Sequence, residues 1–132
     1  MNSKYVFKSK RLGFRVWTKG DLHEFGEINA DKDVMEFYPN PLTIEETEEF
    51  IDRLIAHYAK HGYQYFATEV LETHELIGFI GLAFQRYKTE FSPATDIGWR
   101  LKKSAWGKGY ATEGAERCLE FAFEDLNLKK VF

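Results

Sequence analysis

The order of hydrophobic patterns along the chain is the feature that most restricts its fold. Residues 11–17 alternate between apolar and polar side chains and are rich in β-forming types, which predicts a first strand. The polar stretch that follows, up to about Tyr38, favours one or two short helices. A longer helix is predicted from Thr43 to about Lys60, because apolar residues recur there at helical spacing after a Thr43–Glu46 capping box.

Strand patterns dominate the middle of the chain. We predict a strand for each of three segments, residues 65–71, 76–84 and 95–101. The turn 72–75 joins the first two as a hairpin, and Gly78 and Gly81 indicate a bulge or a close backbone approach. A helix is predicted at residues 110–126, and residues 129–132 look like the start of a further strand. Runs of strands between helices favour an α+β, or mixed α/β, fold in one domain of 132 residues.

Composition narrows the classes of partner. The net charge is −3, so the chain lacks the basic excess expected of a protein that binds nucleic acid or an anionic membrane. No apolar run approaches the length of a membrane span, and the N-terminal residues do not resemble a signal peptide. The single cysteine, Cys118, excludes an internal disulfide, and a cytoplasmic location is the expectation.

The clearest functional signal is the segment WGKGYAT at residues 106–112, between a predicted strand and a predicted helix. Gly107 and Gly109 let the backbone curl closely around a ligand, and a helix N-terminus attracts negative charge, so the turn suits a phosphate group. No acidic residue occurs between Asp96 and Glu113. Four basic residues lie in this interval: Arg100, Lys102, Lys103 and Lys108.

Two common phosphate-binding motifs do not fit this turn. A Walker A loop needs G-x-x-x-x-G-K-[ST], which is absent, and the dinucleotide fingerprint G-x-G-x-x-G needs glycine at Thr112. From spacing alone, an ordinary strand–helix connection with solvated lysines stays open as an alternative.

The segment resembles the acetyl-CoA signature [Q/R]-x-x-G-x-[G/A] of the GNAT family of N-acetyltransferases, with Trp106 at the first position. A W-G-K-G-Y-A-T-E run after I-G-W-x-L, here residues 97–101, is similar to the RimJ/RimL-like subgroup. Three further segments resemble the family in the same order: R-L-x-x-R at residues 11–15, P-L-T-x-E-E-T at 41–47 and L-I-G-F-I-G-L at 76–82.

This resemblance implies the GNAT acyl-CoA N-acyltransferase fold, with a central, mostly antiparallel sheet and flanking helices. It also implies transfer of the acetyl group of acetyl-CoA to a primary amine, either a protein N-terminus or a small molecule. The amine would attack directly in a ternary complex, with acetyl-CoA as co-substrate and no metal. The alternative is a non-catalytic module that binds CoA or a protein partner.

The resemblance also implies how the co-substrate binds. Backbone amides of the glycine turn would hold the pyrophosphate, and the pantetheine arm would pair with the backbone of residues 99–101. Lys102, Lys103 and Lys108 are candidates for the adenosine phosphates, although a solvated surface is an equal interpretation for each. The complete expected set is Trp99, Arg100, Leu101, Trp106, Gly107, Lys108, Gly109, Tyr110, Ala111 and Thr112.

Acetyl transfer needs a group that accepts the proton of the amine or positions a water for that step. Asp96 is the candidate, because it lies on the strand expected to bind the co-substrate; a structural role in strand pairing is the alternative. Phe37 and Tyr38 are expected to line the acceptor cleft or to serve loop packing. The helix dipole explains an acidic residue such as Glu113 at the start of the helix, so we expect a structural role for it.

Two other sets of residues are of types that can act as a nucleophile or bind a metal. Cys118 belongs to a stripe of small residues at helical spacing, so we predict a core position instead of a nucleophile. His57 and His61 have the i, i+4 spacing of metal ligands, but no nearby carboxylate completes an HExxH-like set, so we expect no metal there.

The last expectation concerns the C-terminal end. Family members usually continue beyond a strand start like that at residues 126–132, adding a helix that supplies the general acid and a final hairpin. We therefore expect residues 1–132 to form an N-acetyltransferase domain that lacks this C-terminal part. Weak CoA binding, little turnover and association, including a possible homodimer, would follow.

Overall fold

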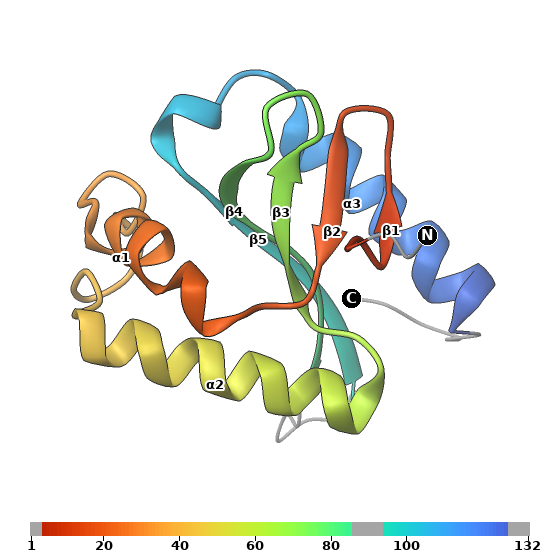
Figure 1. The fold of residues 1–132 in the computed structure, drawn as a ribbon, viewed down its shortest axis with the longest axis horizontal. Helices are drawn as coiled ribbons and strands as arrows, with labels where there is room; N and C mark the ends of the chain where they lie inside the picture. Colours follow the sequence, from red (N-terminus) through yellow and green to blue (C-terminus); the bar gives the residue numbers. More distant parts are fainter. Residues whose placement is uncertain (1–3, 86–93, 127–132) are drawn as a thin grey trace.

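In the described part of the chain, five strands form one sheet in sequence order, and every neighbouring pair is antiparallel (Figure 1). The structure is a computed structural model that describes residues 4–85 and 94–126. The strands are β1 (Phe7–Lys8), β2 (Leu12–Arg15), β3 (Tyr65–Val70), β4 (Glu75–Gln85) and β5 (Ala94–Leu101). The helices are α1 (Leu22–Ala30), α2 (Ile44–His61) and α3 (Tyr110–Glu120), with the short turns η1 (Lys19–Asp21), η2 (Lys103–Ala105) and η3 (Phe121–Asp125).

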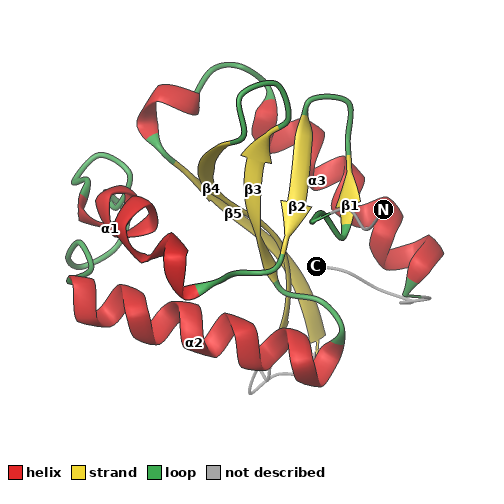
Figure 2. Cartoon of the chain, in the orientation of Figure 1, coloured by secondary structure: helices red, strands yellow, loops and turns green. Residues whose placement is uncertain are grey.

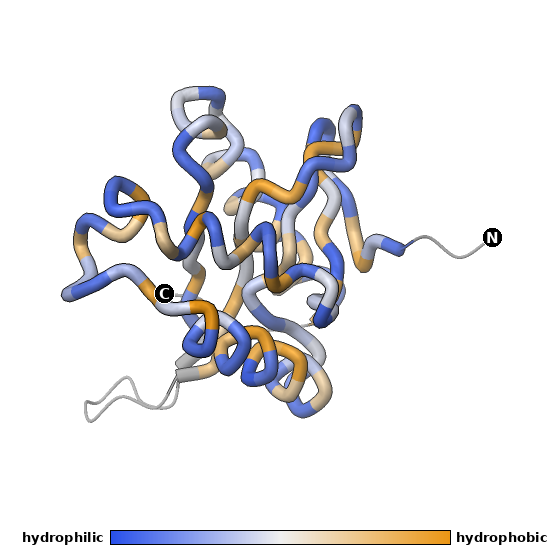
Figure 3. The backbone as a smooth tube through the Cα atoms, turned by 60° about the vertical axis from the view of Figure 1, so that its left-hand side comes forward, coloured by the Kyte–Doolittle hydropathy of each residue, from blue (hydrophilic) through white to orange (hydrophobic). Residues whose placement is uncertain are grey.

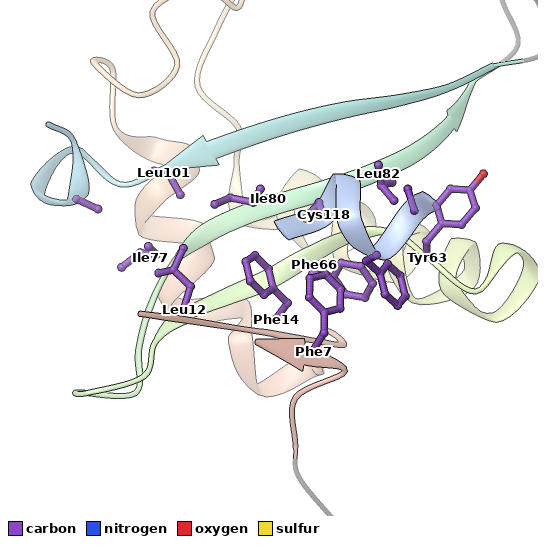
Figure 4. Close-up of a cluster of buried hydrophobic side chains, with 13 residues drawn as sticks. Phe7, Leu12, Phe14, Tyr63, Phe66, Ile77, Ile80, Leu82, Leu101 and Cys118 are labelled. Carbon is purple, nitrogen blue, oxygen red and sulfur yellow. The ribbon is translucent and has the colours of Figure 1, made fainter. Parts of the chain in front are cut away.

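The helices cover the two faces of the sheet unequally (Figure 2). Helices α1 and α2 pack on one face, where Phe25 and Ile51 join a cluster with Phe79 of β4. Helix α3 packs on the other face, where Cys118 and Phe66 belong to a second cluster (Figure 4). This two-sided arrangement follows from the strand period of two, which sends successive side chains to opposite faces.

Helix α2 shows how local sequence sets an element. Thr43 caps its N-terminus and Glu46 completes the capping box, while Gly62 ends the helix in the left-handed region at φ 77°. Apolar and polar residues alternate along it turn by turn (Figure 3), so the apolar stripe faces the sheet. The predicted helix at this position is confirmed.

Glycines in β4 allow close approach of neighbouring backbones. A Cβ placed on Gly78 would lie 2.0 Å from the carbonyl oxygen of Arg100, and one on Gly81 would lie 2.1 Å from that of Gln64. The register of β3 and β4 also shifts between Thr68 and Glu69. The predicted close approach is confirmed.

The mixed α/β fold class is confirmed, with two local differences and one prediction that stays untested. Strand β1 was not predicted, because two residues are too few to show a period. The helix predicted at 110–126 is α-helical only to Glu120 and continues as the π-helical turn η3. The strand predicted at 129–132 lies outside the described residues. Within the part of the chain that the structure describes, no helix is long and apolar enough to cross a membrane.

Candidate active site

The glycine turn connects η2 to α3, and its two glycines adopt left-handed backbone conformations. Gly107 has φ 75° and Gly109 has φ 79°, a region that side-chain-bearing residues rarely enter. Gly109 is the N-cap of α3, and the first helical bond runs from Glu113 N to Gly109 O at 3.0 Å. The N–H groups that precede it in the first turn have no acceptor within the helix, so the turn ends in a cluster of free donors.

A cavity of about 310 Å³, which we name the turn cavity, opens in front of these donors. Its lining is Trp99, Leu101, Ala105, Trp106, Gly107, Gly109, Tyr110, Ala111 and Thr112. Among the residues predicted to bind the co-substrate, Arg100 and Lys108 are the two that do not line it. One concave surface therefore gathers the rest of the predicted set from β5, the turn and α3.

Strand β5 offers backbone groups to the same cavity. Lys102 N donates to Ile77 O at 2.8 Å, so the hydrogen-bonded pairs of this antiparallel ladder include Phe79 with Arg100. The N–H and C=O groups of Trp99 and Leu101 consequently point away from β4. The outward oxygen of Leu101 already accepts a bond from the Trp106 indole at 2.8 Å. Among the described residues, Trp99 therefore keeps both its outward N–H and its outward C=O group available to pair with an extended ligand.

Glu113 braces the turn against the N-terminal hairpin. Its carboxylate accepts bonds from Ser9 Oγ at 2.5 Å, Arg11 N at 2.8 Å and Arg11 Nε at 2.6 Å. Arg11 also donates to the carbonyl oxygen of Lys108 at 2.9 Å. Burial alone would raise the pKa of Glu113, but the bonds from Ser9 and Arg11 outweigh it and hold the pKa below its ordinary value. Glu113 is structural, as predicted, through these bonds and not through the dipole alone.

Two of the three lysines near the turn, Lys102 and Lys103, are engaged elsewhere. Lys102 forms an ion pair with Glu75, and Lys103 pairs with Asp33 at 2.5 Å. Both lysines line a different cavity, between α1 and the β3–β4 turn. The donors that remain at the turn are the backbone N–H groups and Lys108, which lies in the turn itself.

On the opposite face of β5, Arg100 is buried, with only 7% of its surface exposed. Its Nη1 donates to Asn29 Oδ1 at 2.8 Å, and its guanidinium lies 4.8, 5.2 and 5.4 Å from the ring centres of Tyr38, Phe79 and Phe50. Each such contact contributes about 0.5–2 kcal/mol. The sequence does not predict this environment for Arg100; the available signal is a basic residue inside an otherwise β-forming strand.

Arg100 lines a second cavity of about 460 Å³, which we name the α2-side cavity. Its lining is Met35, Tyr38, Pro39, Asn40, Pro41, Leu42, Glu46, Glu49, Phe50, Arg53 and Arg100. Tyr38 is thus placed in a cavity wall, whereas Phe37 is 92% exposed and does not line it. Consecutive residues of β5 line the two cavities, Arg100 this one and its neighbours Trp99 and Leu101 the turn cavity.

The family model described as the acetyltransferase (GNAT) domain matches residues 11–132. The chain belongs to the GNAT acetyltransferase family. YkkB of Bacillus subtilis is 26% identical over 132 residues, 99% of this chain and 76% of that protein. The N-acetyltransferase YnaD of the same organism is 29% identical over 93% of this chain and 68% of its own length. An acetyltransferase structure from Agrobacterium tumefaciens superposes with a TM-score of 0.82 at 25% identity, over 99% of this chain and 74% of that one.

In this GNAT domain, Asp96 lies on β5 opposite Ala83 and is half-buried. Its Oδ1 accepts a hydrogen bond from the hydroxyl of Tyr65 at 3.2 Å. Asp96 and Arg100 are four residues apart on the strand, so they share the face that carries the α2-side cavity. The geometry accommodates both interpretations of Asp96, a proton acceptor and a residue that fixes the neighbouring strand.

The remaining chemically notable side chains of the GNAT domain serve the fold. Cys118 is fully buried, and desolvation raises the pKa of its thiol to about 12, so it does not form the thiolate that a nucleophile requires. His57 has both ring nitrogens in contact with backbone, Nδ1 with Tyr63 O at 2.8 Å and Nε2 with Phe84 N at 3.0 Å. Among the residues that the structure describes, no group of His, Cys, Asp and Glu side chains could hold a metal ion.

Proposed function

We propose that this protein transfers the acetyl group of acetyl-CoA to a primary amine, a protein N-terminus or a small molecule, by direct attack in a ternary complex. One observation carries the proposal: the left-handed glycine turn, the free N–H groups of α3 and the outward edge of β5 all face one cavity. The W-G-K-G-Y-A-T-E segment favours assignment to the RimJ/RimL-like subgroup.

The turn cavity fits the chemistry of a coenzyme A molecule. Backbone N–H groups of Gly107, Gly109 and the first turn of α3 bind the pyrophosphate, because a helix N-terminus favours an anion. The amide groups of the pantetheine arm pair with the backbone of Trp99, as an added strand pairs with a sheet edge. The half-exposed indoles of Trp99 and Trp106 cover the apolar parts of the arm.

The acceptor reaches the thioester from the α2-side cavity. Acetyl-CoA supplies an activated acyl carbon; the amine nitrogen forms a bond to that carbon as the carbon–sulfur bond breaks. Asp96 accepts the proton that the amine loses, directly or through a water, and the sulfur leaves as a thiol after protonation. Tyr38 forms part of the acceptor wall, and Phe37 contacts the parts of a larger acceptor that extend into solvent.

Release of free thiol from acetyl-CoA tests this function. The purified protein is incubated with acetyl-CoA and a panel of small amines and N-terminal peptides, and thiol formation is followed against a control without acceptor. The proposal predicts acceptor-dependent release and an acetylated product of matching mass. Binding of CoA without release, for every acceptor, would instead identify a non-catalytic CoA-binding module.

A further inference from the structure

We infer that the acceptor amine carries a carboxylate, which the guanidinium of Arg100 binds in the α2-side cavity. This inference rests on the proposed acetyl transfer and adds the substrate class to it. It starts from one feature of the described residues: Arg100 is a buried cation, 7% exposed, with no carboxylate within ion-pair distance among them. Burying a charge without a counter-ion is unfavourable, so a missing anion is the simplest completion of the site.

The guanidinium is hydrogen-bonded through Nη1, whereas its Nε has no partner among the described residues. Nη1 donates to Asn29 Oδ1 at 2.8 Å, while Asn29 Nδ2 donates to Thr47 Oγ1 at 3.2 Å and Asn29 O accepts from Leu42 N at 2.9 Å. Nε is buried and has no hydrogen-bond partner within the described parts of the chain. A guanidinium pairs with the two oxygens of a carboxylate through two parallel N–H groups, so a carboxylate that enters from the cavity and displaces the side chains covering Nε is the best-fitting anion.

The other charges of the cavity select against more highly charged anions. Glu46 and Glu49 line it together with Arg53. A phosphate or nucleotide would place two or more negative charges beside these two carboxylates. A molecule with a single carboxylate places only one negative charge beside them and is repelled less.

The position of Arg100 on β5 also restricts the length of the acceptor. Arg100 and Asp96 lie on one face of the strand, four residues apart, which corresponds to ~13 Å between their Cα atoms. If the amine reacts beside Asp96 while the carboxylate binds Arg100, several bonds must separate the two groups. Short peptides with a free acid group and ω-amino acids meet this requirement, whereas α-amino acids do not.

A matched pair of acceptors tests the inference. Aminohexanoate and its carboxamide differ only in the negative charge, and the ratio of their kcat/KM values isolates its contribution. We expect the acid to be preferred about 30-fold or more by the natural protein, and Arg100→Gln to reduce the ratio to near one. Arg53→Gln is the control: it removes an exposed positive charge from the same cavity and should keep most of the preference. Arg100→Lys should retain a smaller preference, because it keeps the charge without the planar fork.

Binding of hexanoate, which has no amine, separates this inference from the proposed function. Arg100→Gln must first show unchanged CoA affinity and far-ultraviolet circular dichroism, which establishes that it folds. Hexanoate binding by calorimetry that is present in Arg53→Gln and lost in Arg100→Gln supports the anion site even if no acceptor is acetylated, an outcome that contradicts only acetyl transfer. Equal binding by all variants, no binding by the natural protein, or displacement by inorganic phosphate at equal concentration would overturn the carboxylate assignment.

Discussion

The two cavities beside β5 differ in the groups that they offer to a ligand: mainly backbone N–H groups in one, and side chains in the other. The turn cavity comes from one short stretch, residues 99–112, and its donors are mainly backbone N–H groups that two left-handed glycines leave exposed. The α2-side cavity is made of side chains from distant parts of the chain, with Arg100 fixed by Asn29 and three aromatic rings. A backbone site depends on few side chains, whereas a side-chain site changes with each substitution.

This difference matches two different tasks. In the proposed function the acyl donor is acetyl-CoA whatever the acceptor, so a site built from backbone geometry suits the part of the reaction that does not vary. Acceptors differ between enzymes, and a cavity built from exchangeable side chains is where such differences are most easily encoded. We therefore expect substitutions at the turn to change donor binding and substitutions at the α2-side cavity to change acceptor preference.

Gly109→Glu should have the largest effect. A side chain at φ 79° is strained, and a carboxylate there would meet the phosphate groups, so CoA affinity should fall at least about 100-fold. Gly62→Glu is the matched control, because Gly62 has φ 77°, has no atom within 4 Å of an added Cβ and ends α2. Calorimetric titration with CoA should show normal affinity for the control. Equal losses in both variants would mean that Gly109 acts through stability and not through the ligand.

Asp96→Asn should slow acetyl transfer on the order of 100-fold with little change in CoA affinity, because it removes the proton acceptor and leaves the turn cavity intact. Tyr65→Phe serves as the control, since it removes the hydrogen bond to Asp96 without removing the carboxylate. Steady-state rates and CoA affinity across the pH range distinguish the two roles. Rates for Asp96→Asn that match the natural protein at every pH would reduce Asp96 to a residue that fixes the strand.

Glu113→Gln should have the smallest effect, a loss of about 1–2 kcal/mol in the free energy of unfolding. Because the folded-state pKa of Glu113 is depressed, its contribution is present above the ordinary value of 4.5 and is lost as the pH falls below it. Urea unfolding at neutral and at acidic pH should therefore show a difference between the proteins that shrinks with acid. If the difference in unfolding free energy stays constant or grows as the pH falls, the ionised Glu113 carboxylate does not stabilise the fold through its bonds to Ser9 and Arg11.

Elements with local signals could be predicted from the sequence. The caps of α2 at Thr43 and Gly62 and the turn between β3 and β4 depend on neighbours along the chain, and the glycine turn follows from the order of strand, glycines and helix. The two residues of β1 could not be predicted, because their structure depends on pairing with β2.

The place of Arg100 in the α2-side cavity could not be predicted for the same physical reason. The environment of Arg100 depends on Asn29, Tyr38 and Phe79, which are separated in sequence and meet only when α1 and α2 pack on the sheet. Arg100 was placed with the co-substrate because the resemblance pairs the pantetheine arm with the backbone of residues 99–101. The strand period sends its side chain to the other face.

The most direct test of the central claim is a titration of isotope-labelled protein with CoA, followed by backbone amide chemical shifts. The account predicts the largest changes at the amides of Gly107, Gly109, Tyr110, Ala111 and Thr112, with a second group at Trp99 and Leu101. Amides around Asn29 and Thr47, beside the α2-side cavity, should change little. Shifts that concentrate at those residues, or no shifts at millimolar CoA with a folded protein, would contradict the assignment of the glycine turn as the donor site.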